Sequence, residues 1–164
     1  MLWHLCNEKN RYKNKMANDN LVRTPFTISK STDGVVYAST DIADSPVAST
    51  LLTYSVPLGM AVQIAPENYV FGQYLNTSAA VIAFGETIIS KSNATGAESR
   101  EIFRGSNGIF GNIGDEFKRP RLGVGVLVNA SEKLIVQVVS VGAVDLDVSA
   151  SNFFIQATQV YEQI

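Results

Sequence analysis

The sequence contains very few of the side chains that catalysis and metal binding use most often. Its 164 residues include one cysteine, Cys6, and one histidine, His4. One cysteine cannot form an intrachain disulfide. Because both residues lie at the extreme N-terminus, a His-based catalytic dyad or a multi-histidine metal site within one chain is disfavoured. A cupin-like enzyme is disfavoured as well, since its metal site needs several histidines. We therefore expect no enzyme activity and no cofactor or metal.

Charge is also scarce, and long apolar runs do not occur. Charged residues make up 17% of the chain, against roughly 25% in ordinary proteins, which predicts a well-filled core or surface buried against other chains. The net charge of -2 gives no electrostatic case for nucleic-acid binding. No run approaches the roughly 20 apolar residues that span a membrane, and no signal peptide is recognisable. We expect neither nucleic acid nor membrane as a partner.

The first 20 residues differ from the rest of the chain. They are rich in asparagine, lack hydrophobic periodicity, and carry the basic residues Lys9, Arg11, Lys13 and Lys15. Two interpretations stay open: an upstream extension of the reading frame, or a basic arm that docks on an acidic neighbouring surface. Residues 21–164 are predicted to form one domain, because this length fits the usual domain size.

Apolar residues alternate with other residues over most of the chain after residue 20. Met60, Val62 and Ile64, for example, are separated by Ala61 and Gln63. Alternation of this kind places one face of a strand on a core. No window of a dozen residues has a helical stripe, and the strands recur every 8 to 12 residues, which favours an all-β antiparallel sandwich or flattened barrel. The alternating segments are 60–64, 122–128, 134–139, 144–148 and 153–161.

Turn residues separate the predicted strands. Asp33-Gly34 is typical of a hairpin turn between residues 26–28 and 35–37. The sequence Val-Pro-Leu-Gly at 56–59 predicts a turn before the strand that begins near Met60. Residues 129–132 separate two valine-rich strands. The best helical candidate, residues 97–103, amounts to a turn or two.

Residues 92–120 are the least strand-like part of the sequence and are predicted to form a long loop, with room for a short hairpin. Glycine recurs every third residue over 105–114, but the Lys-Ser/Thr pair of a P-loop is missing, so a glycine-permissive loop is favoured. Charges of opposite sign alternate over 98–104 and 115–121, which favours mutual salt bridges or contact with another subunit. Long ordered loops are often functional.

Aromatic residues between Pro66 and Asn76 lie on both faces of the predicted strand. Tyr69, Phe71 and Tyr74 therefore include at least one ring that meets something other than solvent. Together with the basic residues of the arm and of the long loop, they are the candidate partner contacts. These candidates are Lys9, Arg11, Lys13, Lys15, Tyr69, Phe71, Tyr74, Arg100, Arg104, Lys118, Arg119 and Arg121.

Two segments resemble known proteins. The stretch 54–64, with Val-Pro-Leu-Gly between two strands, resembles the opening of many viral jelly-roll modules. The stretch 152–162 resembles the closing strand of small jelly-roll head decoration (cement) proteins of tailed bacteriophages. The resemblance implies a jelly-roll-like sandwich and a non-enzymatic decoration protein, made in the host cytoplasm, that sits on the capsid surface of the virion. It further implies a homotrimer that binds and stabilises the lattice of the major capsid protein, with the N-terminal arm as a clamp.

A carbohydrate- or receptor-binding module is the alternative function. It predicts exposed aromatic rings with nearby Asp or Asn side chains at one end or on a concave face of the sandwich. Asp145 and Asp147 are predicted to lie on one strand face, where a Ca²⁺ site is possible and the polar side of an amphipathic strand is favoured.

Overall fold

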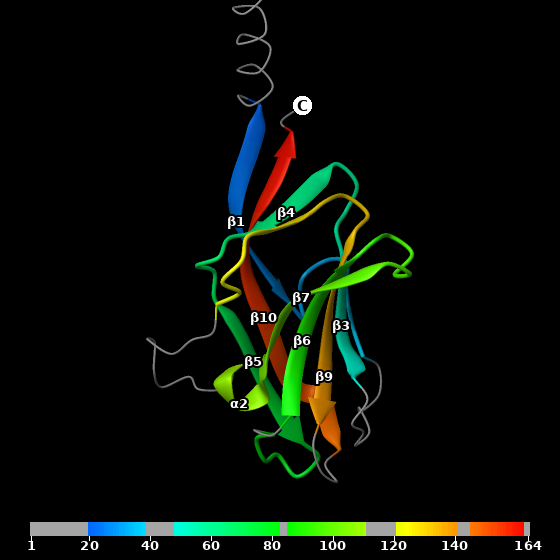
Figure 1. The fold of residues 1–164 in the computed structure, drawn as a ribbon, viewed down its shortest axis with the longest axis vertical. Coiled ribbons are helices and arrows are strands. Elements are labelled where there is room, and N and C mark those ends of the chain that lie inside the picture. The colour runs from blue at the N-terminus through cyan, green and yellow to red at the C-terminus, as the bar shows by residue number, and fades with distance from the viewer. Residues whose placement is uncertain (1–19, 39–47, 83–84, 111–120, 141–144, 163–164) are drawn as a thin grey trace, which may run out of the picture.

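Two β-sheets pack face to face in the computed structural model of the chain (Figure 1), which describes residues 20–38, 48–82, 85–110, 121–140 and 145–162. No helix in these described ranges is long and apolar enough to cross a membrane. The elements in chain order are β1 (Leu21–Ser29), β2 (Val35–Tyr37), β3 (Ser49–Ser55), β4 (Met60–Ile64), β5 (Val70–Asn76), β6 (Gly85–Ser92), β7 (Ser99–Ser106), α2 (Asn107–Phe110), β8 (Val126–Val128), β9 (Lys133–Ser140) and β10 (Leu146–Glu162).

The strands pair in the nested order of a jelly roll. The first sheet, here sheet A, has the order β1-β10-β4-β8 with β5 also paired to β10, and the second, sheet B, has the order β2-β3-β9-β6-β7. β1 pairs with β10, β3 with β9, β4 with β8 and β6 with β7, all antiparallel. The chain is thus a long hairpin whose arms pair from the ends inward and roll into two sheets. The predicted all-β, jelly-roll-like antiparallel sandwich is confirmed.

The longest strand holds sheet A together. β10 pairs along one side with β1, and along the other side first with β5 and then with β4. Its inward positions, Phe153 and Ile155, are at most 1% exposed. They face the inward positions of β9, where Leu134 and Val136 are fully buried. The predicted alternation therefore builds the core between the sheets.

The alternation fails at Val124. Val124 is 48% exposed, although Val126 and Val128 in the same series are buried. Only residues 126–128 of this segment pair as a strand, with β4. Val124 precedes this paired stretch, so the pairing with β4 does not fix the face to which its side chain points.

The two predicted turns exist, but one of them does not make a hairpin. Gly34 has φ +80° and ends the turn that leads into β2. However, β1 pairs with β10 in sheet A and β2 pairs with β3 in sheet B, so this turn carries the chain from one sheet to the other. The turn at 56–59 is confirmed: Gly59 has φ +78°, and the Met60 amide donates to the Pro57 carbonyl at 3.3 Å.

Within the predicted long loop, residues 99–106 form the strand β7. It pairs antiparallel with residues 86–92 of β6, with a β-bulge at Ile102. The prediction of a loop is therefore wrong for these residues, although it left room for a short hairpin, and the helical candidate at residues 97–103 does not form a helical turn. Opposite charges three residues apart suit a helix as well as a strand. The open edge of β6 decides between them, because it offers backbone partners along eight residues. Residues 111–120 lie outside the described part.

Candidate functional site

An aromatic face lies on the outside of sheet A and is defined here by Tyr69, Phe71, Arg121 and Phe154. Val70 is buried in the core, so the side chains of its neighbours Tyr69 and Phe71 point to the outer face of the sheet. Phe71 lies opposite Phe154 of β10, and the two half-buried rings stack with centroids 4.8 Å apart and an angle of 18° between their planes. Such pairs stabilise beyond the area that they bury.

A cation completes the aromatic face. Arg121 and Tyr69 form an isolated β-bridge. The Arg121 guanidinium lies over the Tyr69 ring, 4.9 Å from its centroid, and its Nη2 donates to the Tyr69 hydroxyl at 3.1 Å. The predicted contact residue Arg121 therefore lies against Tyr69, about 50 positions earlier in the sequence, and Phe71 follows two positions after Tyr69.

Tyr74, also predicted as a partner contact, belongs to the core instead. It is 1% exposed, and its hydroxyl lies 2.9 Å from Thr87 Oγ1, which in turn lies 2.8 Å from Asn107 Oδ1. These three buried groups join sheet A, sheet B and α2 in one hydrogen-bonded chain. Burial raises the pKa of Tyr74. The Tyr74 side chain points into the core on the same strand face as Val70, so it is not accessible to a partner.

Arg104, another predicted contact, is occupied by its own chain. Its Nη1 lies 2.6 Å from Glu86 and its Nη2 lies 2.7 Å from Glu101, on the outer face of sheet B. The hydrogen bond from Arg104 lowers the pKa of Glu101, and the two carboxylates raise the pKa of Arg104. Mutual salt bridging is thus the observed arrangement of these alternating charges.

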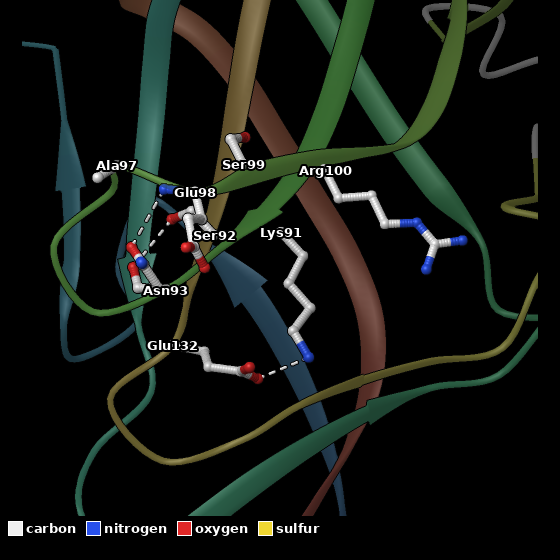
Figure 2. Close-up of a pocket in the computed structure, with 8 residues that line it drawn as sticks. All are labelled: Lys91, Ser92, Asn93, Ala97, Glu98, Ser99, Arg100 and Glu132. Carbon is white, nitrogen blue, oxygen red and sulfur yellow. Dashed lines mark hydrogen bonds and ion pairs between the residues drawn. The ribbon is translucent and has the colours of Figure 1, made fainter.

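A groove opens on the flank of the sandwich where β7 ends sheet B and β8 ends sheet A; it is called the flank groove below. Its larger half is a cavity of about 570 Å³, shown in Figure 2, and its smaller half is a cavity of about 260 Å³ that Lys91 and Arg100 also line. The larger half is lined by Lys91, Ser92, Asn93, Ala97, Glu98, Ser99, Arg100 and Glu132.

An ion pair crosses the flank groove. Lys91 Nζ lies 2.7 Å from Glu132 and donates to the Leu127 carbonyl of β8 at 2.8 Å, so it ties sheet B to sheet A. Burial raises the pKa of Glu132, but hydrogen bonds from Lys91 and from the Asn129 amide outweigh it, and the net shift is downward. Arg100, directly opposite Lys91 in β7, is exposed.

A third hollow of about 370 Å³ adjoins the aromatic face at Phe154. Ser29, Lys30 and Asn152 contribute its polar groups. Lys30 Nζ donates to the Ser149 carbonyl at 2.8 Å and lies 4.8 Å from the centre of the Tyr37 ring. An aromatic ring beside an asparagine is the arrangement that the carbohydrate-binding alternative predicts.

Among the described residues, no group of three or more His, Cys, Asp or Glu side chains is placed to hold a metal ion. Asp147, considered above for a Ca²⁺ site, accepts hydrogen bonds from Ser149 Oγ at 2.6 Å and from the Ala150 amide at 2.9 Å. These bonds lower its pKa. The carboxylate thereby stabilises the irregular stretch of β10 between Asp147 and Asn152.

The remaining predicted contacts, Lys9, Arg11, Lys13, Lys15, Lys118 and Arg119, lie outside the described residues. Two surface residues escaped the sequence reasoning. Phe154 follows the inward Phe153, and because neighbours in a strand face opposite sides, one of the two rings had to face outward. Lys91 carries no such signal, since its position opposite Arg100 depends on the pairing of β6 with β7.

No family model matches the chain, and no curated protein matches its sequence. Among solved structures, it is similar to VP17, a capsid protein of bacteriophage P23-77, with a TM-score of 0.63 and 9% identity over 87% of this chain and 97% of that one. It is equally similar to a chain of the VP16–VP17 complex of the two major capsid proteins of that phage, over 84% of this chain and 98% of that one. The chain therefore has the same fold as these bacteriophage capsid proteins.

Proposed function

We propose that this chain is a structural virion protein that acts by binding other capsid proteins. The observation that carries the proposal is the likeness to VP17, which extends over 97% of that capsid protein and leaves almost none of its fold unmatched. Fold alone does not determine function, so the proposal also draws on the surfaces of the sandwich.

The aromatic face is the proposed contact with the neighbouring capsid protein. Protein interfaces are enriched in Tyr, Phe and Arg, and this face places Tyr69, Phe71 and Arg121 side by side. The outer face of sheet B is more polar: Glu86, Glu101 and Arg104 form ion pairs there. This asymmetry favours sheet A as the side that packs on a partner.

Within the virion, we assign the chain a decoration or cement role on the capsid surface, with the major capsid protein as partner and a homotrimer as the unit that binds. A protein that binds the assembled shell and not its free subunits stabilises the shell by mass action. Trimer formation would bury further apolar strand surface and account for the low charge fraction.

Shells of the source virus prepared without this protein test the cement role. Purified protein should bind these shells but not the free major capsid protein, and should raise the temperature at which the shells disassemble. The substitution Phe71→Asn should weaken binding, whereas Val36→Asn, at a 69% exposed position of sheet B, should not. If shells fail to form without the protein, it is a shell-building subunit and the cement role is wrong.

The oligomeric state has its own test. Size-exclusion chromatography with light scattering should give three times the chain mass of 17.7 kDa. A strict monomer at micromolar concentration would contradict the homotrimer while leaving the capsid contact open to the shell-binding measurement.

A carbohydrate-binding function is the second candidate, supported by the hollow beside Phe154 and Asn152. Glycan-array binding that is lost in Phe154→Ala and kept in Val36→Asn would favour it over the capsid contact. Absence of any glycan binding would remove it.

A further inference from the structure

The two cavities of the flank groove share Lys91 and Arg100 in their linings. The smaller cavity, of about 260 Å³, is lined on one side by residues 100–102 and on the other by residues 124–127. We propose that this groove binds an extended, acidic polypeptide segment of a neighbouring protein, which pairs with β7 as an added strand. The site is separate from the aromatic face, so either proposal can fail without the other.

Charge selects an acidic segment. Lys91 and Arg100 lie directly opposite each other in β6 and β7, and like charges in this position destabilise a sheet. Two carboxylates of the groove are already paired, Glu132 with Lys91 and Glu101 with Arg104. The Arg100 side chain makes no hydrogen bond or ion pair within the described residues. Figure 2 shows the Arg100 side chain extended away from Glu98 and Glu132. A carboxylate of the bound segment would accept a bidentate pair of hydrogen bonds from this guanidinium.

Exposed apolar side chains in the smaller cavity favour an apolar residue in the segment as well. Val124 and Leu127 are 48% and 50% exposed at the same cavity that Ile102 lines. Ile102 is the extra residue of a β-bulge in β7, two positions after Arg100. A paired strand with an acidic residue near Arg100 and an apolar residue near Ile102 would contact both groups.

The edge of β7 supplies the backbone partners. β7 is eight residues long, contains no proline, and stands last in sheet B among the described strands. Edge strands with charged side chains resist unselective pairing. The ion pairs of Arg104 with Glu86 and Glu101 lie on the outer face of sheet B. They therefore do not block the addition of a strand to β7, and strand addition is a common mode of peptide recognition.

Synthetic peptides test the proposal with the full chain. The first probe is a blocked, fluorescent peptide that alternates aspartate with valine, and the second replaces each aspartate by asparagine. Fluorescence anisotropy should show the aspartate peptide binding about tenfold more tightly, because a charge-assisted hydrogen bond is gained. Two further forms of the aspartate peptide carry N-methyl groups on alternate amides, one form for each strand edge. One form should lose binding and the other should keep it.

Substitutions inside and outside the flank groove test whether the peptide binds there. Arg100→Glu should abolish the preference for the aspartate peptide, and Leu127→Asn should weaken both peptides about equally. Arg23→Glu, at an exposed arginine of β1, is the matched control and should bind like the original protein. Circular dichroism verifies that each variant is folded. The proposal is overturned if no peptide binds, if aspartate and asparagine peptides bind equally, if both methylated forms bind alike, or if Arg100→Glu changes nothing.

Discussion

At the scale of single residues, two glycines leave room for the buried polar chain of Tyr74, Thr87 and Asn107. A Cβ atom at Gly72 would lie 2.7 Å from the Tyr74 hydroxyl. Gly85 has φ +107°, and a Cβ atom there would collide with the Val139 carbonyl oxygen and lie 2.9 Å from Asn107 Nδ2. Both contacts are too close for a side chain, so these positions require glycine.

The substitution Gly85→Ala should therefore be strongly destabilising. We expect a loss of about 3 kcal/mol or more in the free energy of unfolding, from backbone strain together with the collision. Gly96→Ala is the matched control: its φ is +80°, but a Cβ atom there meets nothing within 4 Å, so about 1 kcal/mol of strain alone is expected. Urea titration of both variants measures the difference, and equal losses would contradict the collision.

Removing the Tyr74 hydroxyl should destabilise the core while keeping its shape. Tyr74→Phe leaves Thr87 without one of its two partners, and a loss of about 1–2 kcal/mol is expected. A double-mutant cycle with Thr87→Val should show a coupling between the two positions, because the same hydrogen bond is lost in each variant. Additive losses would mean that this bond contributes nothing.

Alkaline pH should unfold the protein through its buried phenols. Burial raises the pKa of Tyr74, and raises that of Tyr37 from 10.0 to about 12. The unfolded chain then releases these protons near pH 10 while the folded chain keeps them, so the stability present below pH 10 is lost as the pH rises towards 12. Thermal melts between pH 8 and pH 12 test this, and Tyr74→Phe should make the decline shallower.

At the scale of elements, the end strands of the two sheets offer different edges for pairing. β7 contains no proline, whereas β1 contains Pro25 opposite Thr158 of β10. Proline has no amide hydrogen to donate, which is tolerated only where that side of the strand faces no partner. β1 therefore lacks one donor on its outer side, and this makes pairing with another chain less favourable.

Restoring that donor should promote association. In Pro25→Thr, β1 gains a free amide on its outer edge, and we expect aggregation to increase with protein concentration, as measured by light scattering. Arg23→Lys, two positions away in the same strand and also exposed, keeps Pro25 and should behave like the original protein. Identical scattering from both variants would mean that Pro25 does not protect this edge.

At the scale of the whole molecule, the described core draws on both sheets. Its buried residues run from Ile28 to Ala157 and come from both sheets. Removing residues 1–15 should consequently change the free energy of unfolding by no more than about 0.5 kcal/mol.

The same truncation tests the proposed clamp. If Lys9, Arg11, Lys13 and Lys15 bind an acidic surface of the shell, the truncated protein should attach more weakly, and the salt sensitivity of attachment should fall because four charges are lost. Co-sedimentation with shells at two salt concentrations measures both effects. Unchanged attachment would reject the clamp and favour the interpretation of these residues as an upstream extension.

Some features followed from the sequence because they depend on neighbours along the chain. Alternation at Val62 and Ile64 predicted buried positions, and both are fully buried. The turn at Gly59 needed a positive φ, which glycine adopts readily. Tyr69 and Phe71 were predicted as partner contacts because aromatic residues occupy both faces of the predicted strand. The same reasoning included Tyr74, since aromatic content does not reveal which strand face meets the core.

Other features depended on which strands pair, and only the tertiary structure decided those. The sequence by itself determined an all-β sandwich, because strand periodicity is a local property. The contact of Arg121 with Tyr69, the opposition of Lys91 and Arg100, and the strand over 99–106 in place of a helical turn all require register between distant segments. The register between two strands is set by the requirement that the apolar side chains of both sheets face the same core. It therefore depends on the whole fold and not on either segment alone.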